Sequence, residues 1–215
     1  MAHIYQAEIR PTKLELLQEW VPKQPWGASA GEGPLERVGA FRFDDPDGEV
    51  GIETFLVRAA SGQLLQVPLT YRAAALEGGE SALLGTMEHS VLGTRWVYDG
   101  CGDPVYVQAV LAAIVTGSQQ ADEMVETDDG LVRRDLTTFV DGSGSPTASV
   151  PTVRTTGSRS DATKTVVDAG ETTIVVRRRL DGDAPAQTSS PVLTGRWPGQ
   201  DAGVVLVTAM LDRIG

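Results

Sequence analysis

Apolar and polar residues alternate along three consecutive segments in the first third of the chain. These segments are residues 35–43, 49–58 and 63–72, and turn-forming residues separate them at 44–48 and 60–62. Alternation with a period of two is typical of strands with one buried face, and short turns join antiparallel neighbours. The pattern therefore predicts a three-strand antiparallel meander.

The second and third segments indicate which face of the meander is buried. The apolar residues that share a face are Val50, Ile52 and Leu56 in the second segment and Leu65, Val67, Leu69 and Tyr71 in the third. The sequence predicts one buried side of the sheet. Pro68 interrupts the third segment, and because proline cannot donate a ladder hydrogen bond, we expect an edge position or a bulge there.

Shorter runs predict further strands on both sides of the meander. Residues 3–9 alternate weakly before Pro11, residues 82–89 predict a fourth strand, and residues 94–98 predict a short extended piece. The last third of the chain contains four more short β-like runs, at 163–167, 172–178, 191–194 and 204–210. We expect this part to form a small β subdomain or to extend the first sheet.

Two helices are predicted from signals at their ends. Thr12 and Glu15 have the spacing of a capping box, which predicts a short helix over 12–21. The second helix is predicted to begin with Asp103 as N-cap before Pro104. Its apolar residues at helical spacing are Val107, Val110, Leu111 and Ile114, and the helix ends at Gly117.

Gly, Ser, Thr and Pro dominate residues 141–161, and this composition buries little apolar surface. We therefore expect a linker or a long exposed loop there, which proteases cut first. The expected division of the chain is a first domain over 1–140, a linker over 141–161 and a small β subdomain over 162–215.

Charge and cysteine content limit the classes of partner. The net charge is -11, and residues 1–150 carry 10 Lys and Arg against 22 Asp and Glu. Because an acidic surface repels phosphate backbones and anionic lipids, we expect neither nucleic acid nor a membrane as partner. With Cys101 as its single cysteine and no apolar run of membrane-spanning length, the chain is expected to be cytoplasmic.

Four stretches of the sequence together are similar to one family. They are Pro11–Leu17, Phe41–Glu53, Val67–Arg72 and Met87–Asp99. In this order they resemble the cap domain that precedes the kinase lobes of actinobacterial maltokinases, over about residues 1–140. The resemblance implies a curved antiparallel sheet with a packed helix, in a family whose kinase body phosphorylates maltose with ATP.

The resemblance to the cap does not carry the kinase chemistry with it. Phosphoryl transfer needs a phosphate-binding Lys, a catalytic Asp and Asn, and a metal-holding Asp. Residues 172–180 resemble the kinase N-lobe strand that carries the Lys, but Val175 takes its place. The expected fold class is therefore α+β, with a curved antiparallel sheet packed by one or two helices and a small β-rich C-terminal part that resembles a degenerate kinase N-lobe.

For the other candidate sites, a structural role explains the residues better than a catalytic or metal-binding role does. His89 and Ser90 are adjacent on a predicted strand, so their side chains point to opposite faces and do not form a catalytic pair. The acidic turn 44–49 lacks the spacing of an EF-hand loop, and we expect a hairpin there and no metal. No catalytic residue and no cofactor is predicted.

The candidate ligand-binding residues are Arg95, Trp96, Tyr98 and Asp99. Trp96 and Tyr98, with Trp20 and Trp26, offer aromatic faces that stack on sugars, while core packing is the default for such residues. Arg95 and Asp99 flank the pair and form either a structural ion pair or a recognition site.

Three hypotheses for function follow from these observations. The first is a non-catalytic accessory or regulatory protein of actinobacterial maltose, trehalose or α-glucan metabolism, which binds another protein such as a kinase or an α-glucan enzyme. The second is an oligosaccharide or small-molecule binding module that uses the aromatic residues near 96–98. The third, ranked lowest, is an enzyme with an unrecognised site.

Overall fold

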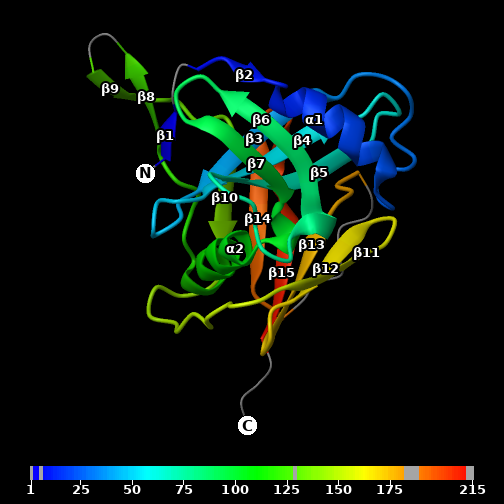
Figure 1. Cartoon of the computed structure of the whole chain (residues 1–215). Helices are drawn as coiled ribbons and strands as arrows, with labels where there is room; N and C mark the ends of the chain where they lie inside the picture. The colour runs from blue at the N-terminus through cyan, green and yellow to red at the C-terminus, as the bar shows by residue number, and fades with distance from the viewer. Residues whose placement is uncertain (1, 5–6, 128–129, 182–188, 212–215) are drawn as a thin grey trace.

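The computed structural model of the chain describes residues 2–4, 7–127, 130–181 and 189–211. Helix α2 lies between two six-strand antiparallel sheets, helix α1 covers the outer face of the first of them, and a small three-strand sheet lies away from α2 (Figure 1). The predicted α+β class, with a curved antiparallel sheet followed by a β-rich part, is confirmed. The resemblance of the second part to a kinase N-lobe stays a prediction.

The first sheet contains the predicted meander and the strands that follow it. Its strands, in spatial order, are β2 (Ile9–Arg10), β6 (Leu83–His89), β7 (Gly93–Asp99), β5 (Leu64–Arg72), β4 (Gly51–Arg58) and β3 (Glu36–Phe43). All neighbouring strands are antiparallel. The five longest of these strands lie within two residues of their predicted bounds at both ends.

The predicted strand over residues 3–9 is wrong. Its two ends lie in different sheets, because β1 (Ala2–Ile4) pairs in parallel with β8 (Glu123–Thr127) while β2 pairs with β6. Residues 5 and 6 lie outside the described residues. The strand β9 (Gly130–Arg133) completes the small sheet with β1 and β8. The weak alternation gave no sign that the two short strands pair with different sheets.

Helix α1 (Lys13–Trp20) has the predicted capping box. The Glu15 amide donates to the Thr12 hydroxyl over 3.2 Å, and the Thr12 amide donates to the Glu15 carboxylate over 2.6 Å. A short 3-10 helix, η1 (Val21–Lys23), follows directly, at the predicted end of the first helix. The apolar face of α1 packs against the outer face of the first sheet through Leu17 and Trp20.

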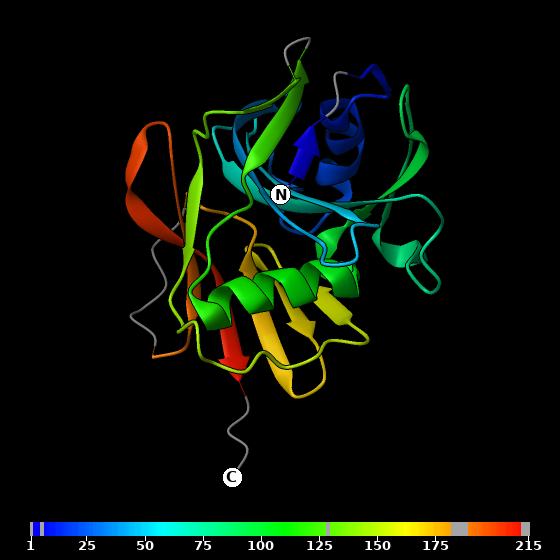
Figure 2. The ribbon, with the colours of Figure 1, turned by 90° about the vertical axis from the view of Figure 1, so that its left-hand side faces the viewer.

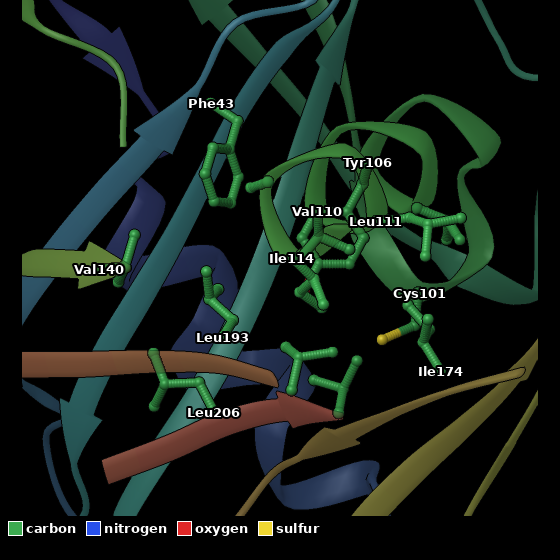
Figure 3. Close-up of a cluster of buried hydrophobic side chains, with 14 of the residues drawn as sticks. Phe43, Cys101, Tyr106, Val110, Leu111, Ile114, Val140, Ile174, Leu193 and Leu206 are labelled. Carbon is green, nitrogen blue, oxygen red and sulfur yellow. The ribbon is translucent and has the colours of Figure 1, made fainter. Parts of the chain in front are cut away.

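Helix α2 (Pro104–Thr116) follows η3 (Gly100–Gly102) and begins at its predicted N-cap. The Asp103 carboxylate accepts from the Val105 amide at 2.9 Å, and it also forms two bonds of 2.7 Å with the Arg72 guanidinium. Figure 2 shows α2 between the two large sheets, and its apolar side chains form the largest core cluster with residues of both (Figure 3).

No helix within the described residues has the length and apolar character needed to cross a bilayer.

The prediction that one side of the meander is buried is incomplete. In β4, Ile52 and Leu56 join the cluster around α2, while Phe55 and Val57 join the cluster under α1. The middle of the sheet is therefore covered on both faces, and even Glu53 is buried. Alternation alone did not reveal the second layer, because the residues between the apolar ones are apolar too in part of the strand.

The second sheet contains all four strands predicted for the last third of the chain. In spatial order the sheet is β10 (Phe139–Gly142), β14 (Val192–Trp197), β15 (Gln200–Leu211), β13 (Thr172–Arg177), β12 (Lys164–Asp168) and β11 (Gly157–Ser160). Strands β10 and β11 were not predicted. Val175, which the resemblance places at the position of the kinase Lys, lies within β13 opposite Thr208.

The segment 141–161 is held to the fold more closely than its composition indicates. Its ends belong to β10 and β11, and between them the Gly144 amide donates to the Ile114 carbonyl at 2.9 Å. A side chain at Gly144 would place its Cβ 1.8 Å from the Val115 carbonyl oxygen, so the close approach to α2 requires glycine. Its longest continuously exposed stretch is residues 143–149, and residues 157–161 are also exposed throughout.

Pro68 lies in an interior strand, at the point where the neighbour of that strand changes. Residues Leu69–Arg72 of β5 pair with β7. Before Pro68, the Gln66 amide donates to the Arg178 carbonyl at 2.9 Å, and the Leu180 amide donates to the Leu64 carbonyl at 2.8 Å. The missing N–H of the proline thus falls between two pairing partners, which explains how an interior strand accommodates it.

A buried ion pair joins the second sheet to the end of β7. Arg178 is fully buried, its Nη2 lies 2.5 Å from the Asp99 carboxylate, and its Nε donates to the Thr165 hydroxyl at 2.7 Å. The guanidinium also lies 4.7 Å from the ring centroid of Trp26. Although burial disfavours the charge, the Asp99 carboxylate raises the pKa of Arg178 above its usual value, so the guanidinium stays charged.

We expect Arg178→Met to reduce the free energy of unfolding by about 3–5 kcal/mol, because it leaves the buried Asp99 carboxylate without its cation. Urea unfolding at neutral pH measures this effect. The matched control is Arg196→Met, which removes an ion pair with Asp141 whose side chains are 51% and 35% exposed. The control should cost less than about 1 kcal/mol, and equal losses in the two variants would contradict the structural role of Arg178.

Limited proteolysis is expected to cut first within residues 143–149, as the composition indicated, and to leave the two pieces associated. They share the cluster around α2, to which Phe41 and Leu111 contribute from one piece and Ile174 and Leu206 from the other. Gel filtration of the nicked protein should give one peak that yields two bands on a denaturing gel. Dissociation into two separately folded pieces would support the predicted division into 1–140 and 162–215.

Candidate functional site

A hollow of about 510 Å³ lies at one end of the first sheet, where all six strands contribute to its lining. The carboxyl ends of β3, β5 and β6 meet the amino ends of β4 and β7 there, and the start of α1 closes one side. The lining residues with ionisable side chains are Lys13, Arg42, Asp44, Asp45, Glu49, Tyr71, His89 and Arg95. Pockets of this size accommodate small organic ligands.

Three groups beside the hollow converge on a single carboxylate oxygen of Glu53. Its Oε2 lies 2.5 Å from Lys13 Nζ and 3.1 Å from Arg42 Nη2, and it accepts from the Tyr71 hydroxyl at 3.0 Å. Lys13 Nζ also lies 4.9 Å from the centroid of the Tyr71 ring. Four elements thus meet at one ion cluster, which fixes the side chains before any ligand arrives.

The electrostatics of this cluster keep Glu53 ionised and Tyr71 protonated near neutral pH. Burial alone would raise the pKa of Glu53, but the charges of Lys13 and Arg42 lower it to about 2. Burial raises the pKa of Tyr71, and the Glu53 carboxylate raises it further. Burial lowers the pKa of Lys13, while Glu53 opposes that shift.

The wall formed by β6 and β7 carries His89 and Arg95. Arg95 Nη2 donates to the Leu92 carbonyl at 2.7 Å, and His89 Nδ1 accepts from the amides of Val91 and Leu92 at 3.3 and 3.1 Å. Partial burial and the nearby positive charges of Arg95 and Lys13 lower the pKa of His89. The imidazole therefore stabilises the hairpin turn.

The acidic turn on the other side of the hollow is a structural hairpin turn. The Asp45 carboxylate accepts from the backbone amides of Asp47, Glu49 and Val50 at 3.2, 3.0 and 2.9 Å. These three bonds are the turn chemistry that the sequence indicates for this segment. The carboxylate groups of Asp44 and Glu49 also line the hollow.

The structure separates the four predicted ligand-binding residues. Arg95 lines the hollow. Val97 belongs to the cluster under α1, so Trp96 and Tyr98 project from the opposite face of β7. Asp99 pairs with Arg178 and accepts from the Cys101 amide. Ligand binding by these residues stays a prediction, but they do not form one site.

The aromatic residues do not form a common stacking platform. Tyr98 is buried and its hydroxyl accepts from the Leu76 amide at 2.9 Å, while Trp96 is more than half buried, as expected. Trp20 and Trp26 lie under α1, with ring centroids 5.6 Å apart. The default interpretation of core packing therefore accounts for three of the four rings.

Sequence analysis missed Lys13, Arg42, Glu53 and Tyr71 as members of a site. One signal was present in the pattern, because Glu53 shares a strand face with Phe55 and Val57 and so places a charge in line with apolar residues. A buried carboxylate requires a cation nearby. The sequence contained no signal for which cations these are.

Stability should depend on pH through Glu53. Its pKa is about 2 in the folded protein and about 4.5 when unfolded, so its stabilising effect is complete above pH 4.5 and is lost as the pH falls toward 2. We expect Glu53→Gln to be less stable than the wild type at pH 7 by on the order of 3 kcal/mol, and the difference to shrink below pH 4. Urea unfolding from pH 7 to pH 3 measures this difference, and a constant difference would contradict the prediction.

Two comparisons with known proteins bear on the family. No curated protein matches the chain. Residues 20–103 match the family model of the maltokinase N-terminal cap domain. The matched range contains three of the four stretches that carried the resemblance, whereas Pro11–Leu17 precedes it. The match runs from the end of α1 to the N-cap of α2 and includes β3, β4, β5, β6 and β7. Residues 20–103 are therefore similar to the maltokinase N-terminal cap domain.

Proposed function

We propose that the chain is a non-catalytic accessory or regulatory protein of maltose and α-glucan metabolism that acts by binding another protein. The match of residues 20–103 to a maltokinase cap domain supports the association with this metabolism. The partner in this proposal is a kinase or an α-glucan enzyme, and the compartment is the cytoplasm.

The charge states of the groups clustered at Glu53 support a role without catalysis. A general base or acid works best when its pKa lies near the working pH. Glu53, with a pKa of about 2, stays ionised and paired near neutral pH, and Tyr71 stays protonated because its pKa is raised. These groups suit a rigid recognition surface better than proton transfer.

Exposed apolar side chains support binding to a protein. Val91 and Leu92, at the turn between β6 and β7, are 56% and 41% exposed, and Leu131 and Val132 in β9 are 51% and 50% exposed. Figure 1 shows that β8 and β9 extend away from the body of the fold. Adjacent exposed apolar residues on projecting hairpins favour a protein contact over a free surface.

The proposal predicts that the protein transfers no phosphoryl group and that it binds its partner through one of the two hairpins. The purified protein should release no ADP from ATP with maltose, glucose or glucosamine, because Val175 stands where the resemblance places the charge-neutralising Lys of that reaction. Cross-linking in an actinobacterial lysate should capture an α-glucan enzyme or a kinase. One of two double variants should no longer capture this partner: either Val91→Ser with Leu92→Ser, or Leu131→Ser with Val132→Ser. Sugar-dependent ADP release above a buffer blank would sink the proposal.

A second candidate function is a small-molecule binding module, as the sequence also indicated. The hollow at the end of the first sheet favours it, since Arg95 and seven other residues with ionisable side chains line one space of about 510 Å³. In this version the ligand contacts Arg95 and the residues around Glu53. Trp96 and Tyr98 lie on the other face of β7 and take no part.

A further inference from the structure

Helix α2 covers one face of the second sheet (Figure 2). In β13, Ile174 and Val176 are buried in the cluster around α2, whereas the alternate residues Thr173, Val175 and Arg177 are partly exposed. Successive residues of a strand point to opposite faces. The partly exposed residues therefore lie on the face away from α2, which we call the outer face of the second sheet.

A row of mainly apolar side chains crosses this outer face. From β14 through β15 and β13 to β12, the strand register places opposite one another Val192, Thr208, Val175 and Val166. Directly opposed residues share a face. All four are partly exposed, and none is among the described residues that pack against either core cluster. An apolar row on an open sheet face favours a contact that covers it.

Opposite charges stand at the two ends of the outer face. Lys164 lies opposite Arg177, two residues before Val166, and forms a cationic end. Asp168 lies opposite Thr173, two residues after Val166, and forms an acidic end. At about 3.3 Å per residue, the two ends are about 13 Å apart, with the apolar row midway between them.

The other charged residues near the outer face do not change this arrangement. Asp141 and Arg196 pair with each other at 2.8 Å, on β10 and β14. The Asp161 carboxylate accepts from the amides of its own turn, at Thr163 and Lys164, over 2.8 and 3.0 Å. Arg159 lies opposite Val166 on the edge strand β11, at the end of the apolar row.

A face with an apolar middle and opposite charges at its ends is complementary to a copy of itself. A twofold axis along the apolar row would reverse the strands of the second copy. Lys164 of each copy then faces Asp168 of the other, and Val166 and Val175 meet their own counterparts. Twofold contacts are the commonest in homo-oligomers, and sheets that pack face to face keep their strands nearly aligned, about 10 Å apart.

We propose that the protein forms a twofold-symmetric dimer in which the outer faces of the two second sheets pack against each other. The four strands of the apolar row span roughly 20 Å, which is small for a protein interface, so we expect a dissociation constant in the micromolar range. The inference is independent of the proposed function, whose hairpins belong to the other two sheets.

Sedimentation velocity of the intact chain from about 1 to 100 µM tests the dimer. We expect the wild type to change from monomer to dimer over this range. Lys164→Glu and Asp168→Lys should each weaken the dimer at least about tenfold, because like charges then meet twice across the twofold axis. A wild type that stays monomeric at the highest concentration would overturn the proposal, as would a dimer that neither variant weakens.

Mixing the two variants tests the predicted geometry. In a mixed dimer of Lys164→Glu with Asp168→Lys, opposite charges face each other at both contacts, so the equimolar mixture should dimerise about as tightly as the wild type. A mixture that stays as weak as its components would contradict the twofold arrangement.

Two controls separate this contact from other effects. The double variant Leu131→Ser with Val132→Ser alters the projecting hairpin and should dimerise like the wild type, and loss of the dimer there would assign the contact to the hairpin instead. Asp168→Asn keeps an oxygen that accepts from the Gly170 amide and should weaken the dimer with unchanged thermal unfolding. An Asp168→Asn dimer as tight as the wild type would remove the charge contact from the proposal and overturn it.

Discussion

The buried pair of Arg178 and Asp99 is the interaction on which the arrangement of the layers depends. Asp99 ends β7 of the first sheet and precedes η3 and α2, while Arg178 follows β13 of the second sheet. One bond therefore fixes the start of the central helix against both sheets, and the contact with Trp26 extends the constraint to the cluster under α1. Because a buried charge without its partner is costly, the pair favours the observed arrangement of the two sheets.

Local signals accounted for most of the fold. The capping box at Thr12, the N-cap at Asp103 and the turn at Asp45 act within a few residues, so the sequence could reveal them. The weak alternation over 3–9 misled, because the partners of a strand lie far away in the chain. For the same reason, the composition of 141–161 did not reveal the close approach of Gly144 to α2. Composition describes how much surface a segment can bury by itself, not what other segments bury against it.

The candidate site was less predictable than the fold. Of the predicted residues only Arg95 lines the hollow, because its neighbours in β7 alternate between two faces and Asp99 has a structural partner. The cluster around Glu53 assembles side chains from α1, β3, β4 and β5, and each looks like an ordinary surface charge or core aromatic in the sequence. A site formed at the end of a sheet by residues of all six strands leaves no regular spacing in the sequence by which it could be recognised.

The change of partner along β5 has a consequence for any shortened form of this protein. The backbone groups of Leu64 and Gln66 bond to residues 178–180, far outside the matched range 20–103. A chain cut after the cap-like segment would present this stretch as a bare strand edge, with apolar Leu65 and Val67 on one face. Such an edge invites pairing with another chain, so a soluble minimal cap would need a polar or proline substitution there, or an added strand to cover it.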